Sequence, residues 1–355
     1  MSDGLLEAWP PLPPGAWLRR PAARLPYPLE EPSCALYSRA RHGLFLGLRA
    51  LGLEAGDEVL MPAYHHGSEV EAAISAGLSC VFYEGNERLE PDAEELERLA
   101  GPRTRALHLT HYLGFPQNAG RWRSWCDERG LLLVEDAAQA WLARDASGPL
   151  GRAGDLVVFC LYKTFGIPDG ATLLLRAAKA PEVQDGAGLG GLARRHAAWL
   201  AARSGAVAGA LAQRRGEPTP YVAEKDFALG DPCPPSALGL KLLRRLAGQD
   251  AASARRLAFR RLISVLGELV PAPFAECPDG ASPFIFPVEV DDKEALLATL
   301  ADRRITALDL WSVPHPALEA ARFPAAARRR ERTVGLPVHQ ELRASDLDRV
   351  AAALR

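Results

Sequence analysis

The feature that most constrains the fold is a regular alternation of short apolar segments with amphipathic helical segments between residues 37 and 177. The segments expected to form strands are 56–64, 78–84, 106–112, 131–139, 155–163 and 171–177. The segments expected to form helices are 37–53, 67–77, 91–101 and 120–130. Strands that alternate with helices favour an α/β architecture with a mostly parallel central sheet. Ligands of such sheets bind beyond the carboxyl ends of the strands, so polar residues that follow the apolar segments are site candidates.

The later part of the chain has a different pattern. Its expected helices are 234–269, 292–305 and 344–355, and its expected strand is 282–290. We therefore predict two domains, a large one over residues 1–229 and a smaller α+β C-terminal domain over residues 230–355. Residues 181–225 are rich in Gly, Ala and Arg, and we expect them to form a mobile segment or an excursion from the large domain.

Two of the apolar segments end in residues that can do chemistry together. LLLVEDAAQAW (131–141) places Asp136 at a strand end, and DLVVFCLYKTFGIPDG (155–170) places Lys163 in a turn rich in Gly and Pro. A lysine amine can form a Schiff base with the aldehyde of pyridoxal phosphate (PLP), and a carboxylate can keep the pyridine nitrogen protonated. The pair therefore predicts a PLP enzyme. Each residue alone has a plainer interpretation, because Asp136 could cap the next helix and Lys163 could be a solvated edge residue.

Composition argues against several other classes of protein. The formal net charge is −2 at pH 7, which gives no general attraction to nucleic acid. No apolar run approaches the ~18 residues of a membrane span. The six cysteines are dispersed without a metal-type spacing, and the N-terminal residues lack the basic start of a signal peptide. We therefore expect a cytoplasmic protein that acts on small molecules, with no metal, nucleic-acid or membrane partner.

Several motifs resemble those of the PLP-dependent nucleotide-sugar aminotransferases of the DegT/StrS type. The matching stretches, in the order of that family, are ALGLEAGDEVLMPAYHHGSEVEAAISAG, HLTHYLGFPQN, ERGLLLVEDAAQAW, GDLVVFCLYKTFGIPDGA and LPVHQELRASDLDRVAAAL. The resemblance implies fold type I of the PLP enzymes, in which a mostly parallel central sheet is followed by a smaller α+β C-terminal domain. It also implies a homodimer, because active sites of this fold type usually lie at a dimer interface.

The resemblance implies roles for residues around the cofactor ring. Lys163 would bind the cofactor aldehyde and then move the proton of the amino-acid α-carbon, and Asp136 would pair with the pyridine nitrogen. Gln139 would lie near the phenolic oxygen of the ring, with an exposed amide on the first turn of a helix as the alternative. His66 would stack on the pyridine face, where the family more often has an aromatic residue. His65 is the alternative for stacking, and a merely polar loop is another.

The phosphate end of the cofactor is where the sequence departs from the family. Ala40 and Arg41 stand about where a Gly-Thr pair usually begins a helix whose N–H groups hold the phosphate. Arg41 could add a charge-assisted hydrogen bond, and Ser38 and Arg39 are also within reach. Cys160 stands where a phosphate-binding serine is usual, and a thiol is a weak donor. Ala40, Arg41 and Cys160 are therefore expected to be cofactor contacts of an altered kind.

The remaining candidates depend on shorter matches. Residues 226–236 lack the Asn-x-Arg element that the family takes from a partner subunit. Tyr112 matches a turn that borders the cofactor, and His315 and His339 lie in segments that resemble approaches to the active site. All three are candidate substrate contacts, with an ordinary surface or core histidine as the alternative for the last two. The ARRRER run at 327–332 is expected to be a solvated helix face.

Together these features predict an aminotransferase of sugar biosynthesis. An amino-acid donor such as glutamate would give its amino group to the cofactor at Lys163, and a carbonyl acceptor would receive it. Family members act on keto-sugar nucleotides, so this is the expected acceptor class. The retained Lys163 argues against the related sugar dehydratases, in which a histidine takes its place. Two alternatives stay open, namely a PLP enzyme of other chemistry that acts on an amino acid in natural-product biosynthesis, and a non-catalytic regulatory or partner-binding protein.

Overall fold

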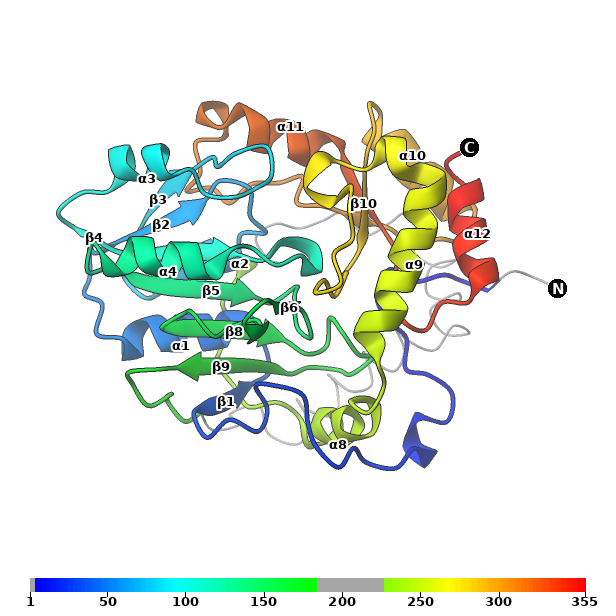
Figure 1. The fold of residues 1–355 in the computed structure, drawn as a ribbon, viewed down its shortest axis with the longest axis horizontal. Helices are drawn as coiled ribbons and strands as arrows, with labels where there is room; N and C mark the ends of the chain where they lie inside the picture. Colours follow the sequence, from blue (N-terminus) through cyan, green and yellow to red (C-terminus); the bar gives the residue numbers. More distant parts are fainter. Residues whose placement is uncertain (1–3, 184–198, 200–226) are drawn as a thin grey trace.

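The computed structural model describes residues 4–183, 199 and 227–355. Its centre is a seven-stranded sheet with the strand order β1-β9-β8-β5-β4-β2-β3 (Figure 1). The strands are β1 (Cys34–Tyr37), β2 (Glu58–Pro62), β3 (Ser79–Tyr83), β4 (Thr104–Thr110), β5 (Leu132–Ala137), β8 (Leu156–Cys160) and β9 (Ala171–Leu175). β9 is antiparallel to both of its neighbours, whereas the pairs from β8 across to β3 are all parallel. The expected α/β fold with a mostly parallel sheet is confirmed.

Helices cover both faces of this sheet. α1 (Ala40–Ala50) and α2 (Ser68–Ser75) pack on one face, and α3 (Ala93–Leu99) and α4 (Ala119–Asp127) pack on the other. Side chains alternate along a strand, so Val134 of β5 joins the first core and Leu133 joins the second. A Cβ atom on Gly47 would lie 2.6 Å from Leu156 Cδ1, so the glycine lets α1 lie close to β8. This close approach brings the start of α1 to the carboxyl edge of the sheet.

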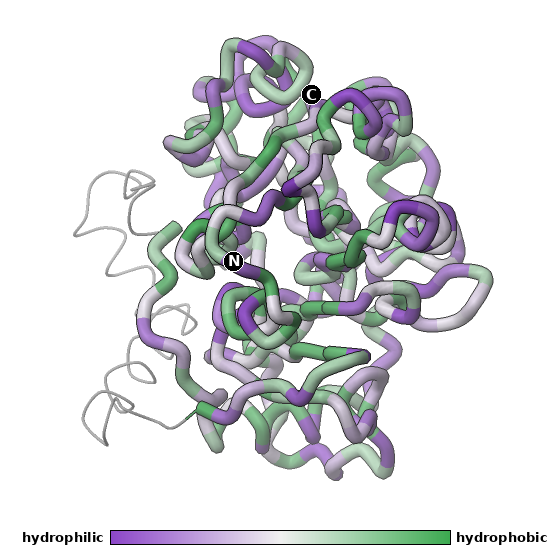
Figure 2. Tube along the Cα trace, turned by 90° about the vertical axis from the view of Figure 1, so that its left-hand side faces the viewer, coloured by the Kyte–Doolittle hydropathy of each residue, from purple (hydrophilic) through white to green (hydrophobic). Residues whose placement is uncertain are grey.

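The C-terminal part forms a second, smaller α+β unit. Its three-stranded antiparallel sheet has the order β10-β12-β11. The strands are β10 (Phe286–Glu289), β11 (Leu308–Asp309) and β12 (Thr333–Leu336). The helices of this unit are α9 (Ala251–Leu266), α10 (Lys293–Asp302), α11 (Pro324–Arg332) and α12 (Ala344–Ala352). The preceding helix α8 (Ala237–Leu246) instead packs on the central sheet, in a core that contains Val157 and Phe159 of β8. In Figure 2 the outer helices carry mixed hydrophilic and hydrophobic residues, as helices with one buried face do.

The N-terminal segment packs against this second unit. Leu6 and Ala8 lie in the same apolar core as α9, β10 and α12. Leu6 N donates to Arg304 O (2.9 Å), and Thr306 N donates to Leu6 O (2.8 Å). The division of the chain at residue 230 stays a prediction.

The remaining elements are short. They are the hairpin of β6 (Arg144–Asp145) and β7 (Gly148–Pro149) and the 3₁₀ helices η1 (Ala16–Leu18), η2 (Tyr112–Gly114), η3 (Gly267–Leu269), η4 (Ala272–Phe274) and η5 (Ala320–Arg322). The long helix expected over 234–269 is two helices, α8 and α9, with a turn between them. Apart from its first residues and residue 199, the segment 181–225 lies outside the described residues. Within the described parts of the chain, no helix combines the length and apolar character that crossing a membrane requires.

Candidate functional site

The carboxyl ends of β4, β5 and β8 meet at one edge of the central sheet. Asp136 near the end of β5 is paired with Thr110 of β4 and with Val158 of β8. Lys163 follows β8 in the hairpin loop 161–170, which connects β8 to the antiparallel β9. The structure therefore brings the two residues of the predicted pair to the same edge of the sheet.

Asp136 is a carboxylate that lies beside a histidine. Its Oδ1 accepts a hydrogen bond from Ala138 N (2.8 Å), and its Oδ2 lies 3.8 Å from Nε2 of His108. Burial raises the pKa of Asp136, while the charges of His108 and Lys163 act in the opposite direction. Among the described residues, Nε2 of His108 has no hydrogen-bond partner. His108 was not predicted as a site residue, and its one sequence signal was a polar residue inside an apolar strand.

The helix expected after Asp136 is not formed. Residues 138–143 form turns, so Asp136 caps no helix there and the capping alternative is wrong. The alternative for Gln139, an exposed amide on a helical turn, is also wrong, because its Oε1 accepts a hydrogen bond from Leu113 N (2.8 Å). The physical reason is local packing: Trp141 is buried, and its Nε1 donates to a backbone carbonyl in the N-terminal region.

The loop that carries Lys163 is held from the second unit. Arg255 of α9 is buried, and its Nη2 donates to the carbonyl oxygens of Lys163 (3.3 Å) and Thr164 (2.8 Å). Gln340 Nε2 donates to the same Thr164 oxygen (2.9 Å). Burial lowers the pKa of Arg255 to about 9, so the guanidinium is still charged at neutral pH. Nζ of Lys163 lies 5.4 Å from the centre of the Phe284 ring, so the backbone is fixed while the amine faces an aromatic surface.

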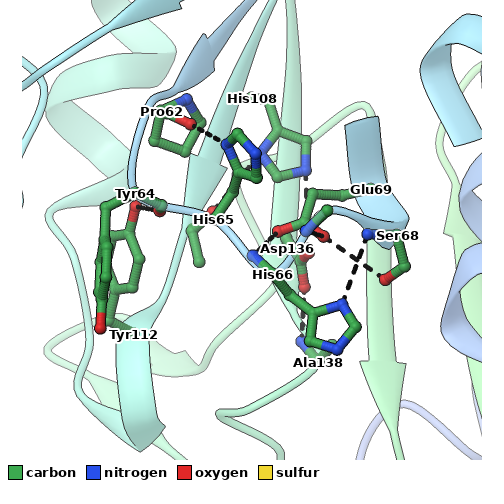
Figure 3. A network of polar contacts seen from close by, with 12 residues as sticks. Pro62, Tyr64, His65, His66, Ser68, Glu69, His108, Tyr112, Asp136 and Ala138 are labelled. Carbon is green, nitrogen blue, oxygen red and sulfur yellow. Dashed lines mark hydrogen bonds and ion pairs between the residues drawn. The ribbon is translucent and has the colours of Figure 1, made fainter. Parts of the chain in front are cut away.

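The adjacent residues His65 and His66 point to opposite sides of their loop (Figure 3). His65 is buried, and its ring stacks on that of Phe82 with 5.4 Å between the centroids. His66 is half-buried, and Figure 3 shows it on the side of the loop opposite His65. Burial lowers the pKa of His66 to about 4, so the imidazole is neutral at neutral pH. The charge of Lys163 lowers the pKa of His66 further.

Glu69 fixes the loop that carries these histidines. It lies in the first turn of α2, where its Oε1 accepts from His66 N (3.0 Å) and its Oε2 accepts from Gly67 N (3.1 Å). Burial raises the pKa of Glu69, but the neighbouring His66 and His65 outweigh this and hold it low. A carboxylate near a helix N-terminus is also stabilised by the helix dipole. Glu69 therefore positions the backbone of His66, and sequence analysis did not identify it.

Tyr112 forms part of the wall beside this loop. Its hydroxyl donates to Tyr64 O (2.7 Å), and its ring lies 5.9 Å from the ring of Tyr64 and 6.2 Å from that of Trp311. Burial raises the pKa of Tyr112 well above its usual range, so the phenol is neutral. Its contact with substrate stays a prediction.

At the other end of the site, α1 begins at Ala40 with Arg39 as its N-cap. The side chain of Arg41 is engaged by the backbone, since its Nη1 donates to Ala228 O (2.6 Å). Arg39 contacts the hairpin loop instead. Cys160 is buried at the end of β8, and burial raises the pKa of its thiol, which is therefore uncharged. The phosphate contacts of Ala40, Arg41 and Cys160 stay predictions.

His315 and His339 both join distant parts of the chain. Nε2 of His315 lies 3.1 Å from Glu71 Oε2, and Nε2 of His339 lies 3.0 Å from Glu7 O. Both histidines are buried. Their contact with substrate stays a prediction.

The expectation of a solvated helix face at 327–332 is wrong at Arg330, which is buried. Its guanidinium donates to the carbonyl oxygens of His65 (2.9 Å) and Ala63 (2.7 Å). This arginine thus holds the backbone of the histidine loop from the second unit, as Arg255 holds the lysine loop. The helical repeat alone could not show it, because the partners are carbonyl groups far away in the sequence.

The N-terminal segment also reaches the site. The ring of Trp9 lies 5.2 Å from that of Phe284 and 6.4 Å from that of Tyr162, and both of these rings adjoin Lys163. Sequence analysis assigned no site role to this segment. A contact between residues so distant in the chain leaves no local pattern.

A model of the DegT/DnrJ/EryC1/StrS aminotransferase family matches residues 29–172, which include the central sheet from β1 to the first two residues of β9. The chain is similar to that family over this region. The resemblance inferred from the motifs is therefore confirmed. The remaining residues, among them the second unit with Arg255 and Arg330, lie outside the match.

Two named relatives match part of the chain. GDP-perosamine synthase of Vibrio cholerae is 31% identical over 128 residues, which are 36% of this chain and 35% of the relative. A dTDP-3-amino-3,4,6-trideoxy-alpha-D-glucose transaminase of Streptomyces venezuelae is 36% identical over 121 residues, which are 34% of this chain and 32% of the relative. The chain thus matches about a third of the length of these curated relatives.

A solved structure extends the likeness to the whole fold. The crystal structure of DesV from S. venezuelae, solved in complex with a ketimine intermediate, matches with a TM-score of 0.67 at 25% identity. The match covers 91% of this chain and 84% of that one. It therefore includes the second unit, and fold type I is confirmed.

Proposed function

We propose that the protein is a PLP-dependent aminotransferase that moves the amino group of an amino-acid donor such as glutamate to a carbonyl acceptor. The observation that carries the proposal is the placement of Asp136 and Lys163 at one sheet edge in a chain of the DegT/StrS type. The relatives named as a perosamine synthase and a dTDP-sugar transaminase support a keto-sugar nucleotide as the acceptor.

The residues at the ring end fit this cofactor. Burial raises the pKa of Asp136, so its negative charge is costly without a cation beside it. A protonated pyridine nitrogen would supply both a counter-charge and a hydrogen bond to this carboxylate. His108 would support the carboxylate from 3.8 Å away, at Oδ2. Bound PLP supplies an electron sink that stabilises negative charge at the amino-acid α-carbon.

Each neighbouring side chain then has a definite task. Lys163 would hold the cofactor aldehyde and would carry a proton on Nζ, and its fixed backbone would confine the motion to the side chain. His66 is neutral at neutral pH because burial lowers its pKa to about 4, so it can pack on the ring without adding charge. The Oε1 of Gln139 is bonded to Leu113 N, which leaves the amide nitrogen as the donor for the phenolic oxygen.

We extend the proposal to the state of the protein in the cell. Fold type I sites usually combine residues of two subunits, which supports a homodimer, and the composition supports a cytoplasmic location. The partners would then be the small-molecule donor and acceptor. Light scattering coupled to size-exclusion chromatography should give twice the mass of the chain.

The function is tested with purified protein and added PLP. Borohydride reduction followed by peptide mass spectrometry should locate the phosphopyridoxyl group on Lys163. Glutamate should then bleach the visible absorbance and release 2-oxoglutarate, and a keto-sugar nucleotide should restore the absorbance.

Two other outcomes would support the alternatives. A covalent adduct without oxo-acid release from any amino donor would favour a PLP enzyme of other chemistry. A protein that stays colourless and forms no adduct would favour a non-catalytic role.

A further inference from the structure

The start of α1 and the loop that carries Lys163 lie side by side. Gly170 N, at the end of that loop, donates to Ser38 O (3.0 Å), just before the helix. The pairing of Tyr37 with Ala171 extends this contact into β1 and β9. A cofactor held at Lys163 would therefore have the first turn of α1 within reach of its far end. This inference accordingly rests on the proposed function.

Arg39 is the cation that faces this junction. Its guanidinium carbon lies 4.7 Å from the centre of the Tyr162 ring, and Tyr162 is the residue before Lys163. The pKa of Arg39 is raised, with Tyr162 as the largest cause and burial as the opposing one. Among the described residues, no carboxylate forms an ion pair with this guanidinium. Its near partner is a phenol, which is weak compensation for a half-buried positive charge.

Tyr162 adds a neutral donor at the same point. Burial raises its pKa to about 12, so its hydroxyl keeps the proton at neutral pH. The hydroxyl also interacts with Cys160, the residue that stands where the family has a phosphate-binding serine. A phenol can therefore donate where the thiol is too weak to do so.

The other candidates for phosphate binding are engaged elsewhere. Arg41 Nη1 donates to Ala228 O (2.6 Å). Ser38 Oγ lies 3.2 Å from His42 Nδ1 and 3.0 Å from Cys233 Sγ. Both side chains are thus committed to contacts that hold α1 in place.

The negative charge of Asp169 disfavours an anion here. It is buried, and its charge acts on Arg39. Its Oδ1 accepts hydrogen bonds from Ser236 N (3.0 Å) and Ser236 Oγ (2.9 Å), which cap α8. These hydrogen bonds from Ser236 stabilise the Asp169 carboxylate. The positive charge of Arg39 offsets the remaining negative charge on the side that faces the site.

We propose that Arg39 and the hydroxyl of Tyr162 bind the cofactor phosphate, together with the N–H groups of the first turn of α1. A guanidinium matches a phosphate with two parallel charge-assisted hydrogen bonds. The first N–H groups of a helix lack intrahelical acceptors and favour an anion. Arg39 thereby replaces the phosphate contacts that the Gly-Thr pair and the serine make in the family.

The test compares PLP with pyridoxal, which has the same ring and aldehyde but no phosphate. Each is titrated into apoprotein, and the dissociation constant is measured by absorbance for the wild type and for Arg39→Gln and Arg41→Gln. Arg39→Gln should weaken PLP binding about 10- to 100-fold, as expected for the loss of one or two charge-assisted hydrogen bonds, and should leave pyridoxal binding nearly unchanged. Arg41→Gln should change neither affinity appreciably.

Two further variants guard against a folding defect. Arg39→Lys keeps the positive charge but loses the two parallel N–H donors of the guanidinium, so it should lose less PLP affinity than Arg39→Gln. Tyr162→Phe should lose the least. Equal losses of PLP and pyridoxal affinity in Arg39→Gln would overturn the inference, as would a phosphate-specific loss in Arg41→Gln alone. Wild-type protein that binds neither compound would instead refute the proposed function.

Discussion

The ring end and the phosphate end of the candidate site are built on different principles. At the ring end, Asp136 and Lys163 follow parallel strands, and buried side chains of the second unit hold the loops that carry the chemistry. At the phosphate end, Arg39 reaches in from the start of a helix and rests on Tyr162. The reacting groups therefore depend on packing between two units of the molecule. Anion binding depends on one cation and its immediate neighbours.

Among single substitutions, Lys163→Ala should separate the ring end from the phosphate end most strongly. The variant should lose covalent cofactor attachment completely, because the amine that binds the aldehyde is gone, while phosphate binding at Arg39 should persist. Borohydride trapping with mass spectrometry measures the first, and competition between PLP and inorganic phosphate measures the second. Lys179→Ala is the matched control, since that lysine is 88% exposed in its side chain. An adduct that survives in Lys163→Ala would show that another lysine carries the cofactor.

Removing the support of the lysine loop should have the next largest effect. Arg255→Met leaves the carbonyl oxygens of Lys163 and Thr164 without this donor and should lower the free energy of unfolding by about 3 kcal/mol. Denaturant titration measures the change. Arg256→Met is the control, because that neighbour donates to Ala281 O at a half-buried position and should cost less than about 1 kcal/mol.

The same variant also sharpens the comparison between the two ends. Arg255 contacts the lysine loop, Pro283 and Gln340, so its loss should weaken PLP and pyridoxal binding by the same factor. A loss confined to PLP would mean that the two ends are not separate.

Acid should lower the stability of both ends of the site, because each end contains a histidine that is neutral in the folded protein. Burial lowers the pKa of His66, at the ring end, and of His42, behind α1, to about 4 in each case. The unfolded chain binds these protons near pH 6.5, so the stability they provide is complete above that pH and is lost as the pH falls toward 4. Each proton should contribute a slope of about 1.4 kcal/mol per pH unit between these limits. Unfolding free energies measured across this window give the slope.

Substitution shows which end is responsible for the acid sensitivity. His42→Gln should remove the slope of one proton while leaving pyridoxal binding intact. An unchanged slope in His42→Gln would contradict the assignment of a neutral buried histidine there.

The smallest effect should follow from loss of stacking at the ring. His66→Ala should weaken PLP and pyridoxal binding equally, by about 2- to 10-fold, because only a ring contact is lost. His66→Phe keeps an aromatic face and should restore most of the affinity. Titration of apoprotein with each compound measures both. A loss restricted to PLP would place His66 at the phosphate end instead.

The sequence predicts the ring end better than the phosphate end for a physical reason. Asp136 and Lys163 each follow an apolar strand, and parallel strands must end at the same edge of a sheet. At the start of α1 the outcome depends on where the helix begins. Arg39 has extended backbone angles (φ −136°, ψ 148°) and Arg41 lies inside the helix, so the two side chains diverge. A motif comparison that selected Arg41 could not detect this difference.

The supporting residues were harder to predict than the reacting ones. Arg255 is one of several arginines in α9, and only its packing against a loop far away in the chain distinguishes it. His108 looked like a polar interruption of a strand. In both cases the partner is distant in sequence, so no local pattern of residues identifies the role.

The antiparallel direction of β9 has a consequence for how such a site can vary. Since β8 and β9 form a hairpin, the loop 161–170 is anchored at both ends by the same ladder, with Cys160 opposite Ala171. Residues can be gained or lost within this loop without moving a helix or shifting the register of a parallel strand. The length of the loop thus sets how far the Lys163 amine extends into the site. Homologous chains could change that distance through this one connection.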